Sequence, residues 1–320
     1  MIKERVAYIL ICMALIITAI FALMLGTQDF SVVQLWQALM GERPEILSTV
    51  LNFRLPRILA AMVAGGMLAS AGAISQAVFR NRLADPTILG VTSAGELFML
   101  IGGMLLPAFS FQKQLFALVG GLFAFALLAN RKTLRQPYQL IIVGVALNLT
   151  FMALTQLFTK GINVGTSLGF NGITWSSVYV LLINGFVGLV AVLLMAPWAN
   201  DLKLPDEQLS SVGVPVTAMR LGLLALVVYL SADVTADVGT IPFIGIIVPN
   251  VARYFVGHDY QTILPFSMLS GAWLLLMVDT IGRIVVLPSE ISAATIMAII
   301  GGPFLIILVQ RGGFHGIKTR

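Results

Sequence analysis

The sequence has few charged side chains. Of its 320 residues, 10% are Asp, Glu, Lys or Arg, whereas ordinary soluble domains carry about 25%. Hydrophobic residues make up 58% of the chain, and the mean hydropathy is +0.98. A soluble protein of this length with so few charges would aggregate. The composition therefore excludes a soluble enzyme and predicts an integral membrane protein.

Cysteine and histidine are also scarce. Cys12 is the single cysteine, which excludes an intrachain disulfide and a cysteine-based metal cluster. The two histidines, His258 and His315, are too far apart in the sequence for a zinc site. The phosphate-binding pattern G-x-x-x-x-G-K-[ST] is absent. We therefore expect no catalytic residue, no metal and no cofactor bound by this chain.

Long apolar runs separate the few charges, and helices are the default elements that span a membrane. We expect an all-α protein, with residues 1–320 forming a single transmembrane domain. The apolar runs predict ten spans, at about 6–26, 57–79, 88–107, 114–130, 138–159, 175–197, 214–232, 241–256, 263–282 and 291–310.

Lysine and arginine predict the orientation of these spans. The pI is 9.6, but the basic residues are spread over many loops, so they indicate membrane topology rather than nucleic-acid binding. With both termini on the cytoplasmic side, most of them lie inside. The outer segments then hold only Arg43, Arg54, Arg57, Lys113, Lys160 and Arg283.

The second span carries an unbroken row of small residues. These lie four positions apart, on one face of a helix: Ala61, Gly65, Ala69, Ala73 and Ala77. Small residues let a second helix approach closely, which is how helices associate in lipid. We expect this span to be packed against protein rather than exposed to lipid.

Two connecting segments are long enough to fold. Residues 27–56 predict a short amphipathic helix on the outer surface. Residues 198–215 form the only sizeable cytoplasmic connection, where Pro205 suits a first helical turn and Asp206 and Glu207 favour the N-terminal end. Gly213 and Pro215 should end that helix. The segment is either a solvated connector or a helix against which a partner protein acts.

A few polar residues lie within the apolar runs, where charge is costly. Gln76 and Asn148 fit either hydrogen bonding between helices or the lining of a path through the membrane. Glu96 has no partner nearby in the sequence and fits either a water-filled path or a pair across helices. Asp279 and Arg283 lie one helical turn apart, which favours a local ion pair.

Several motifs are distributed over nearly the whole chain. They are RLPR at 54–57, NRLADP at 81–86, GVAL at 144–147, DEQLSSVGV at 206–214, GTIPFIGIIVPNVAR at 239–253 and GGPF at 301–304. Together they resemble the iron-siderophore/vitamin B12 (FecCD-type) family of ABC transporter permeases. The chain departs from the family pattern at Arg82, at Glu96 and at 163–172.

The resemblance implies an ABC importer type II permease architecture in the bacterial cytoplasmic membrane. The implied partners are a second permease subunit, identical or related, two ATPase subunits and an extracellular or periplasmic substrate-binding protein. ATP and Mg would bind to the ATPase subunits, so this chain would not itself be an enzyme. The implied cargo is a bulky iron chelate, with a ferric siderophore first, heme second and cobalamin third.

The resemblance also implies roles for individual residues. Three arginines match the positions that dock the binding protein in the family, where we expect exposed ion pairs: Arg54, Arg57 and Arg283. The alternative is that they anchor the chain to lipid headgroups. Asn81 and Leu83 match the cytoplasmic gate.

Residues 206–214 match the loop that couples the permease to the ATPase, which implies coupling roles for Asp206, Glu207 and Gly213. The polar residues Gln76, Glu96 and Asn148 would line the path. An ion-coupled secondary transporter is the competing class, and Glu96 is its strongest support, since a lone membrane carboxylate can carry protons.

Overall fold

The computed structural model describes residues 2–26, 28–107, 109, 111–128, 137–159, 169–287 and 289–310. Within these ranges every regular element is a helix, which confirms the predicted all-α class. The helices are α1 (Ile2–Met24), α2 (Val32–Leu39), α3 (Pro44–Thr49), the π-helix η1 (Val50–Arg54), α4 (Leu55–Val78), α5 (Val91–Leu105), α6 (Gln112–Leu128), α8 (Pro137–Thr159), α9 (Trp175–Leu194), α10 (Ala196–Asp201), α11 (Asp206–Ser211), α12 (Val216–Val238), α13 (Ile244–Val256), α14 (Tyr260–Ile284) and α15 (Ala293–Gln310).

Each of the ten predicted spans corresponds to a helix. Seven helical stretches in the described ranges are long and apolar enough to cross a membrane. Three shorter apolar helices, α5, α6 and α13, account for the remaining predicted spans. The basic segments at 131–135 and 311–320, together with Lys160, lie outside the described residues, as does 163–168 of the departing segment.

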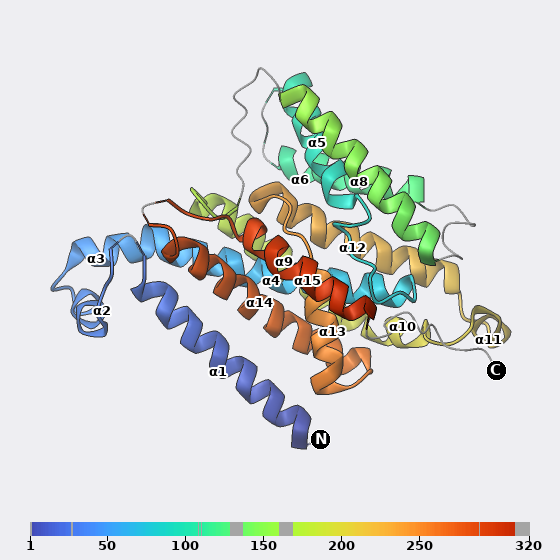
Figure 1. Cartoon of the computed structure of the whole chain (residues 1–320), viewed down its shortest axis with the longest axis horizontal. Coiled ribbons are helices and arrows are strands. Elements are labelled where there is room, and N and C mark those ends of the chain that lie inside the picture. The colour runs from blue at the N-terminus through green and yellow to red at the C-terminus, as the bar shows by residue number, and fades with distance from the viewer. Residues whose placement is uncertain are drawn as a thin grey trace.

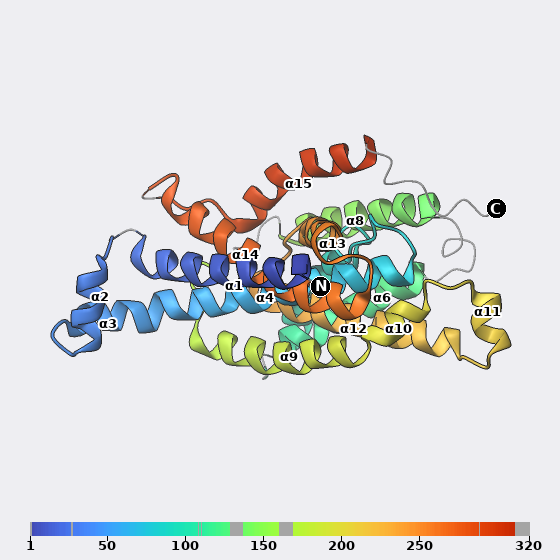
Figure 2. The ribbon, with the colours of Figure 1, turned by 90° about the horizontal axis from the view of Figure 1, so that it is seen from below.

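Most of the long helices run along the long axis of the molecule (Figures 1 and 2). The short helices α2 and α3 lie at one end of this axis, and α10 and α11 lie at the other. This arrangement separates the chain into two ends, each carrying residues that the sequence marks as candidates for function.

The helix α4 forms the centre of the molecule and packs against α9, α12, α13 and α14. Its row of small residues is buried, as predicted. At Gly65 a Cβ would overlap the backbone of Gly271 in α14, and at Gly72 it would overlap Gly245 in α13. Backbone contact on two sides therefore requires glycine at these positions.

Two sequence-based boundaries are wrong. The span predicted at 214–232 continues to Val238, because Asp233 does not end the helix. Its carboxylate is buried and accepts a hydrogen bond from Asn184 at 2.6 Å. The short helix predicted within 27–56 is present as α2. The start of the span predicted at 57 is wrong, because α3 and η1 precede α4 and continue directly into it.

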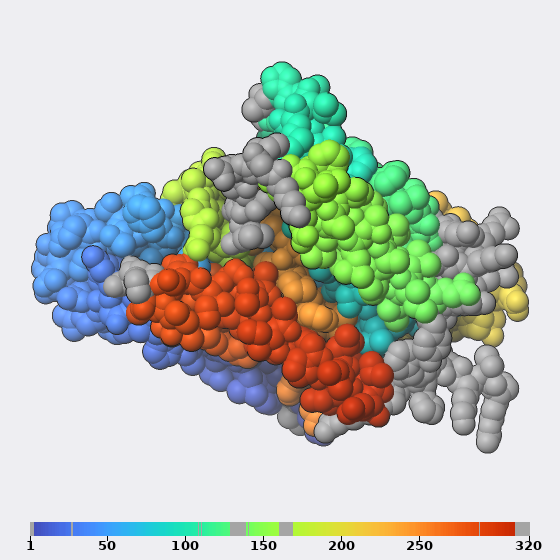
Figure 3. Space-filling model, turned by 45° about the horizontal axis from the view of Figure 1, so that its top comes forward, coloured from blue at the N-terminus to red at the C-terminus, as the bar shows by residue number. Residues whose placement is uncertain are grey.

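One face of the molecule presents α8 and α15 at its surface (Figure 3). In this view other segments, set further back, are visible between the two helices. Both carry large apolar side chains that are exposed in the single chain, among them Ile142, Leu149 and Met152 on α8 and Ile299, Ile306 and Ile307 on α15.

Candidate functional site

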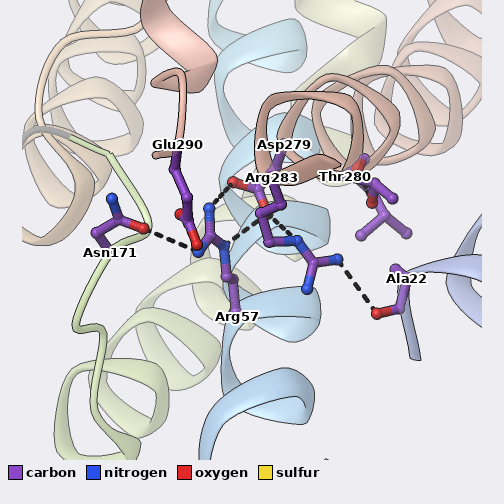
Figure 4. Close-up of polar contacts among 8 residues, drawn as sticks. Ala22, Arg57, Asn171, Asp279, Thr280, Arg283 and Glu290 are labelled. Carbon is purple, nitrogen blue, oxygen red and sulfur yellow. Dashed lines mark hydrogen bonds and ion pairs between the residues drawn. The ribbon is translucent and has the colours of Figure 1, made fainter. Parts of the chain in front are cut away.

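An ion-pair cluster lies at the end of the molecule that carries α2 and α3, and Arg57 is at its centre (Figure 4). Arg57, near the start of α4, donates two hydrogen bonds to the carboxylate of Asp279 on α14. Its Nε lies 2.8 Å from Asp279 Oδ2, and its Nη2 lies 2.8 Å from Oδ1. This two-point geometry is the strongest form of arginine–carboxylate pair.

Arg57 also reaches two connecting segments. Its Nη1 donates to Asn171 Oδ1 and to Glu290 Oε2, both at 2.8 Å. Asn171 precedes α9, and Glu290 lies between α14 and α15. A single guanidinium therefore joins two helices and two connections at this end of the molecule.

Arg283 forms the expected local ion pair with Asp279, one helical turn away, beside the closer pair that Arg57 makes with the same carboxylate. Arg283 Nε lies 3.7 Å from Asp279 Oδ2, too long for a hydrogen bond. Its Nη2 instead donates to the carbonyl of Ala22 on α1 at 3.2 Å. Asp279 pairs mainly with Arg57, because that fork reaches both carboxylate oxygens from the neighbouring helix.

Arg54 closes the C-terminal end of α1. Its guanidinium donates to the carbonyls of Leu23 and Gln28, and it lies over the Phe30 ring with 4.2 Å from Cζ to the ring centroid. The last carbonyls of a helix attract a cation. Arg54 therefore serves as a cap between α1 and the start of α4.

The expectation that the three docking arginines are exposed is wrong for the single chain. Arg54 is 6% exposed and Arg283 is 5% exposed, and the Arg57 side chain is 12% exposed. Each is covered because it finds acceptors within the chain. They nevertheless line a cavity of about 560 Å³, together with Gly26, Gln28, Thr49, Phe53, Phe170, Asn171, Gly172, Ile173 and Glu290.

The turn after α4 lies at the opposite end of the molecule and carries the predicted gate residues. The side chain of Asn81 accepts a hydrogen bond from the backbone N–H of Leu83 at 3.0 Å, which fixes a tight turn. Leu83 is only 9% exposed. Asn250 of α13 donates to the carbonyl of Arg82 at 3.1 Å and holds the turn from the other side.

The predicted coupling loop folds as a short helix. Its boundaries follow the sequence signals: α11 begins at Asp206 and ends at Ser211, before Gly213. Pro205 precedes the helix as its N-cap residue rather than lying in the first turn. Gly213 adopts a φ of +80°, a conformation that glycine takes without strain, and it is exposed, as is Glu207.

Asp206 faces the body of the molecule. Arg220 of α12 and Arg80 of the turn after α4 both donate to its carboxylate. Partial burial alone would raise the pKa of Asp206. The guanidinium groups of Arg220 and Arg80 outweigh that effect and hold the pKa of this carboxyl below its usual value.

The three polar residues expected along a path have different surroundings. Gln76 is buried, donates to the Gly245 carbonyl at 2.8 Å and accepts from Arg253 at 2.6 Å, so it joins α4 to α13. Asn148 is half-buried on α8. Whether either residue lines a path remains a prediction.

Glu96 has a partner that the sequence does not reveal. Its Oε1 accepts hydrogen bonds from the backbone N–H of Thr240 at 3.0 Å and from its hydroxyl at 2.6 Å. Thr240 lies in the connection between α12 and α13, 144 residues away. In this structure Glu96 therefore joins α5 to the connection between α12 and α13.

Sequence reasoning missed several members of these sites. Arg80, Arg220 and Glu290 carried no assignment, although each contacts a residue that did. Their partners lie between 14 and 233 residues away in the sequence. No local spacing rule connects positions so far apart, so the fold is needed to reveal them.

The described helices, with α4 central and short helices at both ends, form the architecture of an ABC transporter permease. A solved structure of the metal-chelate type of ABC transporter, in an inward-facing conformation, matches with a TM-score of 0.81 and 27% identity. The match covers 96% of this chain and 99% of that one. PsaBC from Streptococcus pneumoniae shares the fold, with a TM-score of 0.60 and 15% identity, over 82% of this chain and 94% of that one.

Residues 14–311 match the FecCD transport family, and the chain belongs to this family. Among its relatives is the protein named "Probable heme-iron transport system permease protein IsdF" of Staphylococcus aureus strain Newman, 36% identical over 96% of both chains. The protein of the same name from the bovine strain RF122 is 35% identical over the same shares. The resemblance inferred from the motifs is therefore confirmed.

Proposed function

We propose that this chain is the membrane permease subunit of an ABC importer for heme iron. The observation that carries this proposal is the 36% identity, over 96% of both chains, to proteins named as heme-iron transport permeases. The sequence alone placed a ferric siderophore first and heme second. The names of these relatives support heme.

Energy for import would come from a separate ATPase pair. The chain has no nucleotide-binding loop of its own, and ATP with Mg would bind to those partners. A second permease subunit would cover the face formed by α8 and α15, whose exposed large apolar side chains suit such a contact. Asn81 and Leu83 would then close the path at the end of the molecule near α11.

The distribution of charge supports an orientation with α10 and α11 in the cytoplasm. Four basic residues lie near this end. Arg80 contacts the α10–α11 connection and Arg220 contacts α11. Lys203, in that connection, donates to the carbonyl of His258, and Arg253 of α13 donates to Gln76 of α4. An excess of basic residues on the cytoplasmic side is the general rule. The end carrying α2 and α3 would face outward, with the chain in the cytoplasmic membrane of a bacterium.

The outer end would dock the binding protein through Arg54, Arg57 and Arg283. The cavity that they line offers guanidinium groups to an incoming carboxylate. Because Arg57 already holds Glu290, docking would exchange one carboxylate for another rather than create a new ion pair. Such contacts set association rate and register more than affinity. Raising salt should therefore slow association, because charges are screened beyond ~8–10 Å.

The test is uptake by the whole transporter, reconstituted in lipid vesicles with its ATPase and its binding protein. We expect ATP-dependent uptake of heme, and no comparable uptake of a ferric siderophore or cobalamin. Uptake of the siderophore instead of heme would overturn the cargo. Uptake without the ATPase, driven by an ion gradient, would overturn the importer assignment and favour a secondary transporter.

A further inference from the structure

The carboxylate of Asp206 joins three segments at the end of the molecule near α11. Arg220 on α12 binds it at two points, with Nη1 2.8 Å from Oδ2 and Nη2 2.8 Å from Oδ1. Arg80 approaches from the turn after α4, with Nη2 2.7 Å from Oδ1. Asp206 is the first residue of α11, so both arginines hold the same end of that helix.

Arg80 makes further contacts with the same loop. Its Nε donates to the carbonyl of Leu202 at 2.7 Å, and its Nη2 also donates to the carbonyl of Leu204. Leu202 and Leu204 lie between α10 and α11. The guanidinium of Arg80 therefore binds both the backbone of the α10–α11 connection and the start of α11.

The backbone of Arg80 belongs to the gate turn. It follows Phe79, the C-cap of α4, and directly precedes Asn81. Arg80 adopts a φ of +47°, in the left-handed region that a residue with a side chain rarely occupies. Such a conformation persists where the surroundings hold it in place. The backbone holds it here, because the N–H groups of Arg80 and Asn81 donate to the carbonyls of Ala77 and Gln76 at the end of α4.

We propose that Arg80 is a positioning residue that transmits movement of α11 to the gate turn containing Asn81 and Leu83. This inference rests on the proposed function, since it is the ATPase that would move α11. Asp206 is directed inward and serves as the attachment point. The exposed Glu207 and Gly213 are left to contact the ATPase. Arg220 attaches α11 to α12, whereas Arg80 attaches it to the gate turn.

The linkage is suited to a moving part. The Arg80 and Asp206 side chains are 38% and 44% exposed, so water can replace their contacts when the loop moves. Exposed pairs of this kind contribute little to stability. The Arg80 linkage can therefore be broken without unfolding the chain, which makes its effect on coupling measurable.

The experiment uses the complete transporter in lipid vesicles and reads gate movement independently of cargo. Cys12, the single cysteine, is replaced by serine, and Leu83→Cys provides a thiol in the gate turn. Leu83 is nearly covered in this structure, so labelling by a membrane-impermeant thiol reagent reports opening of the turn. We expect ATP turnover to change the labelling rate in this background.

Adding Arg80→Ala should remove most of the change in labelling caused by ATP while hydrolysis continues. We expect the change to shrink severalfold, because the turn after α4 then loses its side-chain attachment to α11 and to the α10–α11 connection. Arg220→Ala is the matched control, because it removes the other arginine from the same carboxylate. It should leave the labelling change within about twofold, since Arg80 still holds Asp206.

Two further variants guard against a folding defect. Asp206→Asn keeps the shape of the side chain and should reduce the labelling change in the same direction as Arg80→Ala. The double variant Arg80→Ala with Asp206→Ala should be no worse than either single variant, because both break one linkage. Melting of each purified complex shows whether it is folded.

The outcomes separate this inference from the proposed function. Normal ATP-driven labelling in the Arg80→Ala variant would overturn the role of Arg80, as would additive effects in the double variant. A labelling rate insensitive to ATP in the parent background would overturn it as well. Heme uptake by the parent transporter tests the cargo separately, because the labelling readout needs no cargo.

Discussion

The two ends of the molecule hold the same chemical arrangement in different surroundings. At the end that carries α2 and α3 Asp279 receives Arg57 and Arg283, and at the end near α11 Asp206 receives Arg80 and Arg220. The side chain of Asp279 is 2% exposed, whereas that of Asp206 is 44% exposed. Because of this difference in burial, the Asp279 cluster holds helices together rigidly (a brace), whereas the contacts of Asp206 can be replaced by water.

Burial changes what each arrangement does because water competes for exposed charges and not for buried ones. A buried carboxylate that loses its arginine is left without compensation, so the pair holds its helices rigidly. An exposed pair forms and breaks at little cost. The cluster of Asp279, Arg57 and Arg283 therefore fixes α1, α4 and α14 relative to one another, while the cluster around Asp206 permits α11 to move.

The largest expected effect comes from removing the buried carboxylate. Asp279→Ala leaves Arg57 and Arg283 without their shared partner, and we expect a loss of about 3–5 kcal/mol in the free energy of unfolding. Chemical unfolding of the detergent-solubilised chain measures this. Glu290→Gln, at the 23%-exposed rim of the same cluster, is the control and should cost far less. Equal stability of Asp279→Ala and the unmodified chain would contradict the brace.

A smaller effect is expected on association of the proposed binding protein with the cluster around Arg57. Glu290→Gln weakens the hold on Arg57 Nη1 but leaves the two bonds to Asp279 intact. Association of the binding protein should then quicken by roughly two- to fivefold, the range expected for a net contribution of about 0.5–1 kcal/mol from one hydrogen bond. The rate constant can be measured by surface-immobilised binding kinetics.

The control for docking is Glu45→Gln. Glu45 is exposed on α3 at the same end of the molecule, so its removal changes the net charge equally without touching Arg57. An equal acceleration in both variants would show that charge alone matters. That result would remove Glu290 as a competitor for Arg57.

The exposed carboxylate should matter little for stability. Asp206→Ala is expected to change the free energy of unfolding by less than ~1 kcal/mol, because solvent screens both of its partners. The same unfolding experiment used for Asp279→Ala gives the value. A loss as large as that of Asp279→Ala would show that the two clusters do the same work, and the comparison would fail.

The smallest effect is expected from pH. Arg220 and Arg80 hold the pKa of Asp206 below its usual value. A depressed pKa stabilises the folded form above the unfolded pKa of about 3.9, and this contribution is lost as pH falls through the lower folded pKa. The ATP hydrolysed per heme imported should therefore stay constant between about pH 5 and 8. A transition in this ratio between about pH 5 and 7 would point to another titrating group.

Much of the fold was predictable because apolar length and small-residue spacing are local signals. The ten spans and the buried row from Ala61 to Ala77 needed only neighbouring residues in the chain. The ends of α11 were predictable for the same reason, because an acidic first turn and Gly213 act locally. The end of α12 was not, since Asp233 depends on Asn184 in another helix.

The candidate sites were predictable as positions but not as contacts. Motif matching identified Arg57 and Asp206, yet their partners come from distant segments. Exposure was also misjudged for Arg54, Arg57 and Arg283, because acceptors within the chain cover them. Charge and spacing alone cannot show whether an arginine meets solvent or a carbonyl of another helix.

The most direct test of the difference between the two ends is the ATP hydrolysed per heme imported, measured for Asp206→Ala and Asp279→Ala. Both variants are reconstituted in vesicles, and activity is normalised to folded protein. We expect the ratio to rise severalfold for Asp206→Ala, since Arg80 and Arg220 lose the carboxylate through which they hold α11. The fraction of Asp279→Ala that folds should keep the ratio of the unmodified transporter. An unchanged ratio for Asp206→Ala, or an equal rise in both variants, would contradict the account.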